Sequence, residues 1–448
     1  MKKLLKRLGH VALIVLIMFL IFVMLKLIAY SLPSSNIKSN VQLSFEQLEK
    51  EGLYPRIFGG GTPQLAGLQL DNWTDSIFLN VAYCADDRNP MEAMAGDYFG
   101  IATENRTDPL YDFAYTVEND GNNPRGQYMR QWFGMEVYLR PLLCIFTISE
   151  IRILTQFIML TLLLIATVHI ERKIDRKTAF AFFAGILSAN IVIVSSSVNF
   201  YGAFFIILLA AIFIPVLNSK FSEFDLMLII GGSTAFLDLF AMPFATFPII
   251  TMLIVMKKNR EYTGFAFKEN IKLLFRCAVG WIMGYIILWG GKWVLASLVL
   301  KTNCFRDAWL EMVNAGTMRP EWGPDTTIEM IRQSLKLNWG AIFPINLIQI
   351  LNQRYGINIG VLLIALFFVG NIYVVKRYHL CLNKSSYLVV ILLLAVAPYG
   401  YFIIMNAHSF VHYWFSYRSQ CATVMGIILV SCNLWERRES KAKIGGEL

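Results

Sequence analysis

The sequence predicts an all-α polytopic membrane protein, with about ten transmembrane helices and a large first extracytoplasmic loop. Of its 448 residues, 56% are hydrophobic and only 16% are charged. Apolar stretches recur along the chain, and many approach the roughly 20 residues that one helix needs to cross a bilayer. These stretches are too long for the strands of a barrel, and a helix satisfies its backbone hydrogen bonds within itself.

Residues 1–30 are expected to form the first transmembrane helix, with the N-terminus in the cytoplasm. A basic start, "MKKLLKRLGH", precedes an apolar core that runs from Val11 to about Tyr30. This core is longer than the roughly 7–15 residues of a cleaved signal peptide. We therefore expect the segment to be retained.

Nine further spans are predicted. They lie near 151–170, 178–197, 201–217, 226–240, 242–256, 277–299, 359–375, 387–406 and 419–435. The apolar run 226–256 is ambiguous, because it is too long for one span and short for two. Pro243 and Pro248 near its middle favour a break, since proline interrupts a helix. Two short spans there also keep every later basic loop on the side of the N-terminus.

The distribution of charge supports this topology and places both termini in the cytoplasm. More than half of the 40 Lys and Arg residues fall in the predicted cytoplasmic segments, as the positive-inside rule requires. The predicted outer loop 31–150 instead holds 16 acidic and 8 basic residues. The net charge of +9 is therefore interpreted as helix anchors at a membrane surface, and nucleic acid is not an expected partner.

The chain thus divides into membrane and loop regions. They are the first helix at 1–30, an extracytoplasmic loop at 31–150, helices two to seven at 151–300, a second extracytoplasmic loop at 301–358, helices eight to ten at 359–435, and a cytoplasmic tail at 436–448. In the second loop, "AIFPINLIQIL" is too short to span and is expected to be re-entrant or interfacial.

The first loop ends in "QYMRQWFGMEVYLRPLLCIF", which mixes apolar and charged residues at helical spacing. This pattern predicts a helix lying in the membrane interface. Arg130 and Arg140 are expected at headgroup level, with Trp132, Phe133 and Leu143 in the acyl layer.

Four aspartates in the first loop are candidate catalytic residues. Asp71 and Asp75 are four residues apart, which on a helix places them on one face, and Asp86 and Asp87 form an alternative acidic site. Carboxylates at a membrane surface suit general-base work on a sugar hydroxyl, or binding of a divalent cation. Solvated aspartates, or a helix N-cap at Thr74 or Asp75, are the simpler interpretations.

The turn "HSFVHYWFSYR" at 408–418 supplies groups of opposite character at the same predicted membrane face. Arg418, His408, His412 and Tyr417 are candidates for binding a substrate or a lipid phosphate, for which arginine offers bidentate contacts. The two histidines are four residues apart, a spacing that can bind a metal. An interfacial aromatic belt is the simpler explanation for the tyrosines and the tryptophan.

Two ionisable residues fall within predicted spans, where charge is costly and usually marks a site. Asp238 precedes the Pro243 break. Lys292 lies in "WGGKWV" and is a candidate for binding a lipid-linked phosphate, with snorkelling toward the membrane surface as the alternative.

This arrangement resembles the GT-C superfamily, the multi-span glycosyltransferases that use polyprenyl-phosphate-linked sugars. The likeness is architectural: a cytoplasmic N-terminus, one span, a large acidic outer loop with interfacial helices, and then many spans, some of them short. The resemblance implies that Asp75 or Asp71 is the general base, and that Arg140, His412 and Arg418 contact the phosphate. The chain departs from the family in the roughly 40 residues between its first span and these aspartates, and in lacking a separate C-terminal outer domain.

The implied function is transfer of a sugar from a polyprenyl-phosphate-linked donor to a glycan or lipid-linked acceptor, at the outer face of the plasma membrane, in cell-envelope polysaccharide assembly. The implied partners are the lipid-linked sugar donor, the acceptor and membrane lipids. A polymerase or ligase of lipid-linked polysaccharide, a flippase or transporter of lipid-linked saccharide, and a non-catalytic assembly subunit are the alternatives. No Walker-type segment is visible, so the activated donor would supply the energy. No cofactor is certain, and Mg²⁺ or Mn²⁺ is left open.

Overall fold

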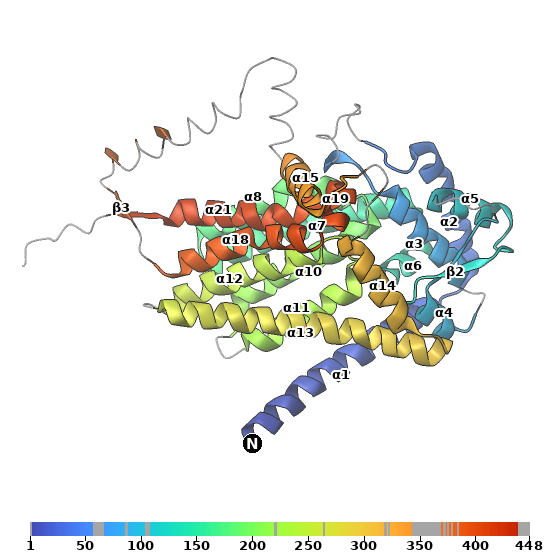
Figure 1. The fold of residues 1–448 in the computed structure, drawn as a ribbon, viewed down its shortest axis with the longest axis horizontal. Helices are drawn as coiled ribbons and strands as arrows, with labels where there is room; N and C mark the ends of the chain where they lie inside the picture. The colour runs from blue at the N-terminus through green and yellow to red at the C-terminus, as the bar shows by residue number, and fades with distance from the viewer. Residues whose placement is uncertain are drawn as a thin grey trace, which may run out of the picture.

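The computed structural model describes residues 2–56, 67–85, 88–103, 108–218, 222–262, 265–317, 320, 323–342 and 385–437, with a few residues between 369 and 382. The described chain is mostly helical, as the sequence predicts (Figure 1). Five of its helices are long and apolar enough to cross a membrane: Leu5–Tyr30, Ile148–Lys173, Val198–Val216, Phe267–Leu300 and Tyr387–Ile404. They indicate an integral membrane protein, while the full count of ten spans stays a prediction.

These five helices belong to one helical bundle. It consists of α1 (Lys2–Tyr30), α7 (Ile148–Lys173), α8 (Arg176–Ser188), α9 (Ile191–Val194), α10 (Val198–Phe213), α11 (Glu223–Leu237), α12 (Thr246–Glu261), α13 (Phe267–Leu300), α18 (Tyr387–Ile404) and α21 (Cys421–Asn433), with short 3-10 turns at Ile214–Val216, Pro243–Ala245 and Tyr417–Gln420. Helices occupy nine of the ten predicted spans. Most of the remaining span, 359–375, and most of "AIFPINLIQIL" lie outside the described residues.

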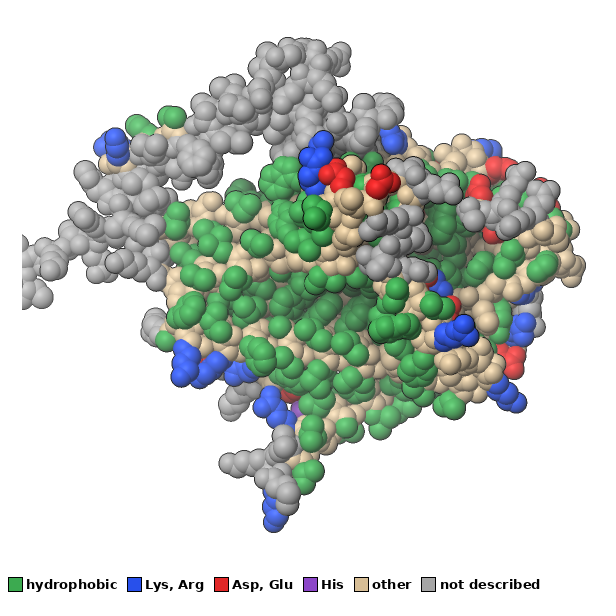
Figure 2. All heavy atoms as spheres, viewed as in Figure 1, with side chains coloured by type: hydrophobic (Ala, Val, Ile, Leu, Met, Phe, Trp, Pro, Cys, Tyr) green, Lys and Arg blue, Asp and Glu red, His purple; other side chains and the backbone are tan. Residues whose placement is uncertain are grey.

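Hydrophobic side chains cover the visible face of the bundle (Figure 2). Lys and Arg gather at the end where α13 begins, and mixed charges appear at the opposite end. This banding is what a bilayer requires of a helical protein, because apolar side chains face lipid while charges stay near the headgroups.

A smaller unit, the α2–α6 domain, packs against one end of the bundle (Figure 1). It contains α2 (Ser34–Glu51), α3 (Asn72–Cys84), α4 (Pro90–Gly96), α5 (Pro109–Glu118), α6 (Glu136–Leu143) and the antiparallel strands β1 (Tyr98–Gly100) and β2 (Arg125–Gln127). Four more helices lie near this end: α14 (Cys304–Thr317), α15 (Thr327–Gly340), α19 (Asn406–Val411) and α20 (Tyr413–Ser416). A two-stranded pair, β3 (Leu380–Leu382) with β4 (Trp435–Arg437), lies at the other end of the bundle.

The apolar run 226–256 forms two helices, as its prolines predict. Helix α11 ends at Leu237, Pro243 opens a 3-10 turn, and α12 begins at Thr246. Phe240 in the break has a φ of 63°, a left-handed conformation that only a few per cent of non-glycine residues adopt. With 15 residues, α11 is about 22 Å long, shorter than a bilayer core of about 30 Å.

Helices α11 and α13 approach each other through glycine. A Cβ on Gly284 would lie 2.0 Å from the carbonyl oxygen of Leu228, and a Cβ on Gly231 would lie 2.0 Å from that of Trp281. Gly280 and Gly284 form a GxxxG spacing on α13. Small residues at such positions let helix backbones approach closely where lipid removes the hydrophobic drive for association.

The predicted interfacial helix at 127–146 is wrong. Only Glu136–Leu143 is helical, and the exposed fractions of Trp132, Phe133 and Leu143 are 1%, 2% and 0%. The Trp132 indole N–H donates to the Leu288 carbonyl over 2.8 Å. The segment is buried inside the protein. Its mixture of apolar and charged residues reflects contacts with the bundle on several sides, whereas an interfacial helix would have one lipid-facing side.

Candidate functional site

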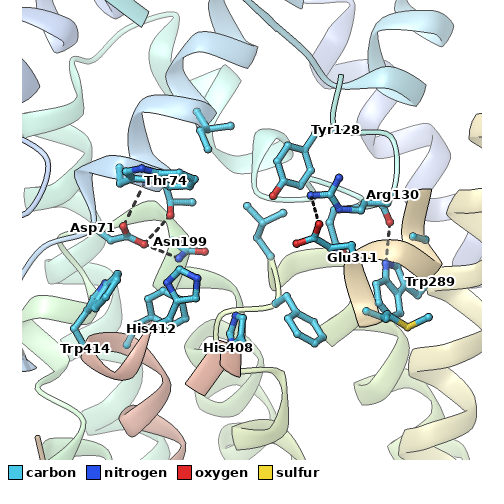
Figure 3. Close-up of a pocket in the computed structure, with 18 of the residues that line it drawn as sticks. Asp71, Thr74, Tyr128, Arg130, Asn199, Trp289, Glu311, His408, His412 and Trp414 are labelled. Atoms are coloured by element: carbon cyan, nitrogen blue, oxygen red, sulfur yellow. Dashed lines mark hydrogen bonds and ion pairs between the residues drawn. The ribbon is translucent and has the colours of Figure 1, made fainter. Parts of the chain in front are cut away.

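A cavity of about 180 Å³ lies where the α2–α6 domain meets the bundle (Figure 3). It is lined by Tyr54, Asp71, Trp73, Thr74, Ile77, Tyr128, Arg130, Gln131, Asn199, Leu239, Phe240, Trp289, Ala308, Glu311, Met312, His408, His412, Trp414 and Phe415. Polar groups of both charges stand among many aromatic rings. Such concave sites, largely apolar with a few placed polar groups, are typical of small-ligand binding.

Asp71 lies on one side of this cavity as the N-cap of α3. Its carboxylate oxygen Oδ2 accepts hydrogen bonds from Thr74 Oγ1 (2.7 Å) and Asn199 Nδ2 (2.8 Å). Oδ1 accepts only a long bond of 3.4 Å from the Thr74 N–H among the hydrogen bonds of the described chain. Burial raises the pKa of Asp71, against the effect of these hydrogen bonds and of the nearby Arg418. The carboxylate lines the cavity and is oriented mainly through Oδ2, while Oδ1 accepts only the long bond.

Asp75 is not among the residues that line the cavity, although it lies near Asp71 and both carboxylates contact Asn199. Asp71 precedes the first helical residue, Asn72, as the N-cap of α3, and Asp75 lies in the first helical turn. Asp75 is fully buried beside Arg152, with Oδ2 3.4 Å from Nη2 of the guanidinium. Burial raises the pKa of Asp75 to about 7.

Arg152 joins three elements around Asp75. It lies at 2.9 Å from Glu51 Oε2 on α2, and its Nη2 donates to Asn72 Oδ1 over 2.7 Å. This network anchors the start of α3, and therefore the position of Asp71, to α2 and α7. Asp75 is a structural member of that network.

His408 and His412 line the cavity together, with ring centroids 4.9 Å apart. His408 belongs to α19, and His412 caps that helix. His412 stacks on Phe415 at 5.0 Å, and His408 meets Phe240 edge to face at 5.2 Å. Burial lowers the pKa of His412 to about 4 and that of His408 well below its usual value. Both imidazoles are therefore neutral near pH 7 and can exchange hydrogen bonds, but they bring no positive charge to a phosphate.

The opposite side of the cavity carries Tyr128, Arg130 and Glu311 (Figure 3). The Arg130 guanidinium lies 4.3 Å from the Tyr128 ring centroid, and its terminal nitrogens lie 3.4 Å from Asp307 and Glu311 carboxylates of α14. Indole N–H groups of Trp289 and Trp293 both donate to the Arg130 carbonyl, at 2.8 and 2.9 Å. The backbone of Arg130 is firmly held on α13.

Arg418 and Tyr417 lie behind the cavity wall and do not line it. Arg418 is fully buried, and its guanidinium donates to the carbonyls of Trp414 (2.6 Å) and Gly67 (3.3 Å) and lies 4.2 Å from the Phe200 ring centroid. The Tyr417 hydroxyl donates to the Gly67 carbonyl over 3.1 Å and accepts from Asn190 over 2.7 Å. Both residues hold the turn onto the chain near Gly67. The expected direct contact of either with a lipid phosphate does not fit this placement.

Arg140 and Lys292 are also buried away from the cavity. Arg140 donates to the carbonyls of Ala29 (2.9 Å) and Ala82 (2.7 Å), tying α6 to α1 and α3. Lys292 and Lys26 both contact Asp97, at 2.9 and 2.5 Å. Lys292 therefore does not snorkel toward the membrane surface. Its ammonium group is paired with the buried Asp97, which also contacts Lys26.

Asp86 and Asp87 lie outside the described residues. Several cavity residues went unpredicted as site residues: Tyr54, Tyr128, Asn199, Trp289 and Glu311, along with Arg130, which was expected at lipid headgroups. Tyr128 and Arg130 share one segment, but the others come from separate parts of the chain, so no local spacing predicts the set. The one available signal was the density of aromatic and polar residues in segments such as "QYMRQW".

Within the described part of the chain, no three His, Cys, Asp or Glu side chains gather closely enough to hold a metal ion. In comparisons with known proteins, no family model, no curated protein and no solved structure matches the chain.

Proposed function

We propose that this protein is a membrane glycosyltransferase that moves a sugar from a polyprenyl-phosphate-linked donor to a glycan or lipid-linked acceptor. The supporting observation is the cavity that joins Asp71 to His408 and His412, which come from opposite ends of the sequence. The proposed site faces the outer side of the plasma membrane, with both termini cytoplasmic. The concentration of Lys and Arg in the opposite loops supports this orientation.

Asp71 is the proposed general base. An acceptor hydroxyl would donate its proton to Asp71 Oδ1 as its oxygen bonds to the anomeric carbon of the sugar. The bond between that carbon and the donor phosphate oxygen breaks in the same step, so polyprenyl phosphate leaves with the electron pair. A carboxylate whose pKa is raised by burial is a stronger base than an exposed one, which favours proton transfer.

The aromatic walls and the neutral imidazoles suit a saccharide. Trp73, Trp414 and Tyr54 line the cavity and would provide aromatic surface for the C–H groups of a sugar. His412 Nδ1 is buried and has no hydrogen-bond partner among the described residues, so it can serve a hydroxyl. Uncharged donors and acceptors match the hydroxyls of a sugar better than they match a phosphate.

The direct test is glycan transfer by the purified full-length protein with a polyprenyl-phosphate-linked sugar. Asp71→Asn keeps the shape of the side chain and its oxygen acceptor but removes the base, and should lower transfer by at least about a hundredfold. Donor binding should persist. Full transfer activity in Asp71→Asn would overturn the proposal, as would substrate flux across the membrane with no new glycosidic bond.

A further inference from the structure

Arg130 is the cation of the cavity. Of the described residues that line it, Arg130 is the one Lys or Arg, while Arg140, Lys292 and Arg418 are each used elsewhere in the fold. A guanidinium stays charged at physiological pH and presents a planar fork that matches phosphate oxygens. Arg130 is therefore the cationic partner that this cavity offers to the anionic part of a ligand.

The present partners of Arg130 hold it weakly. Both ion pairs to α14 are long, at 3.4 Å, and the side chains of Asp307 and Glu311 are 36% and 51% exposed. Water reaches these two carboxylates and weakens the pairs, although the Arg130 side chain itself is 15% exposed and also contacts the Tyr128 ring. In addition, Arg130 Nε is buried with no hydrogen-bond partner among the described residues. The guanidinium thus has unused donor capacity although its backbone is fixed by two indoles.

Helix α14 lies beside this guanidinium. Ala308, Glu311 and Met312 face the cavity, whereas Phe305 and Trp309 on another side of α14 are 48% and 64% exposed. In a bilayer these exposed apolar rings would meet lipid. The two carboxylates that contact Arg130 thus belong to the same helix as these exposed rings.

We infer that Arg130 is the phosphate-binding residue of the cavity. Until a phosphate replaces them, Asp307 and Glu311 of α14 pair with the Arg130 guanidinium as internal counter-anions. This inference rests on the proposed function for the identity of the ligand, a phosphate ester of a long-chain alcohol. In this exchange, Arg130 gives up one long contact with each of Asp307 and Glu311, which are partly exposed to water. It gains a bidentate contact with the phosphate inside the cavity. The released carboxylates are already partly exposed and return to water.

The single cationic side chain among the described lining residues also sets the orientation of a bound donor. Arg130 lies on one side of the cavity, and Asp71, His412 and Trp414 lie on the other (Figure 3). With the phosphate at Arg130, the group that reacts would lie toward Asp71. A phosphate on the Asp71 side would face a carboxylate and two neutral imidazoles, which repel it or offer it no charge. The donor therefore has one favourable orientation.

The test is equilibrium binding of a polyprenyl phosphate to the full-length protein in nanodiscs, compared with the polyprenol of the same length. The wild type should bind the phosphate at least tenfold more tightly than the alcohol. Arg130→Gln should remove most of this difference while leaving binding of the alcohol unchanged. Arg306→Gln is the matched control, because Arg306 is an exposed arginine on α14 that does not line the cavity.

A second variant tests the counter-anions. Asp307→Asn with Glu311→Gln should tighten binding of the polyprenyl phosphate severalfold, whereas Glu49→Gln, at an exposed position on α2, should not change it. Equal binding of phosphate and alcohol by the wild type, or an unchanged preference in Arg130→Gln, would overturn the Arg130 site. Unchanged or weaker binding in the α14 double variant would overturn the exchange.

Inorganic phosphate identifies the source of the anion. Displacement of the lipid by millimolar inorganic phosphate supports a site for the phosphate alone, and lack of displacement supports a site for the lipid headgroup. The proposed function is judged separately, by the loss of transfer in Asp71→Asn. Arg130-dependent binding without any transfer by the wild type would leave the phosphate site standing and remove the enzyme.

Discussion

Asn199 Nδ2 donates a hydrogen bond to Asp71 Oδ2 over 2.8 Å, joining α10 of the bundle to the cap of α3 in the α2–α6 domain. The bond spans 128 residues of sequence. It stabilises the ionised carboxylate and so lowers the pKa of Asp71, which burial raises. The bundle thereby tunes the candidate base of the other domain.

Replacing Asn199 with leucine should shift the pH dependence of transfer. Without this donor the pKa of Asp71 rises further, so the ionised base is lost at a higher pH as the solution is acidified. The acidic limb of kcat/KM should therefore move to higher pH, with activity nearly restored well above it. A limb that keeps its position would show that Asp71 is not the group titrating in transfer.

Arg152→Gln should strongly destabilise the protein. The substitution leaves Asp75 buried without its cation and removes contacts to Glu51 and Asn72. Breaking a buried pair in this way costs about 3 kcal/mol or more of the free energy of unfolding. Thermal unfolding in detergent should show the loss as a lower midpoint.

Arg176→Gln is the control for that change. Arg176 pairs with Glu171 at 3.0 Å, but the two side chains are 88% and 44% exposed. Its removal should alter stability by less than about 1 kcal/mol. Similar losses in the two arginine variants would mean that the Arg152 network adds nothing beyond a surface pair.

Asp97→Asn should cost more stability than Lys292→Met. Asp97 accepts from both Lys26 and Lys292, and the Tyr30 hydroxyl also donates to it. Its loss strands two buried cations, at a cost of about 3–5 kcal/mol, whereas loss of Lys292 leaves the aspartate with Lys26. Comparing the two unfolding midpoints checks the order, and a reversed order would contradict the shared-anion arrangement.

Gly284→Leu should separate α11 from α13. The new side chain would start 2.0 Å from the Leu228 carbonyl, so the helices must move apart, at a cost of about 1–3 kcal/mol. Gly290→Ala is matched on the same helix, where a Cβ would meet nothing within 4 Å. That change should be neutral or stabilising by up to about 1 kcal/mol, because alanine favours a helix over glycine.

His412 should make stability depend on pH below neutrality. Its folded pKa is about 4 and its unfolded value is about 6.5, so the unfolded chain binds the proton first as pH falls. The contribution of neutral His412 to the free energy of unfolding is full above pH 6.5 and declines toward pH 4. The loss is about 2 kcal/mol between pH 7.5 and 5. His412→Phe should flatten the change of unfolding midpoint over that range, and an unaltered slope would show that His412 is already accessible to protons.

The helices of the bundle were largely predictable, because apolar length and proline positions are local properties. The break before Pro243 is local as well, because proline cannot continue a helix and is favoured where the next one begins. The pairing of charges was not predictable. Arg140, Lys292 and Arg418 look like candidates for an external phosphate, yet each finds carbonyls or a carboxylate in segments far away in sequence.

The two aspartates of α3 illustrate the same limit within one turn. The spacing of four residues brings Asp71 and Asp75 near each other, but Asp71 is the N-cap and lines the cavity, whereas Asp75 is buried beside Arg152. An N-cap is recognisable from sequence, but the preceding "GLQL" gives no strong signal of where the helix begins. Which of the two carboxylates lines the cavity therefore depends on partners far away in sequence, Asn199 for Asp71 and Arg152 for Asp75.

The walls of the cavity come from residues as early as Tyr54 and as late as Phe415, and Arg418 near the end of the chain closes onto Gly67 near its beginning. A ribosome has therefore released nearly all of the polypeptide before this chamber can be enclosed. Partly synthesised chains are without the proposed activity, and splitting the protein at any point within that interval leaves neither piece with a complete binding chamber.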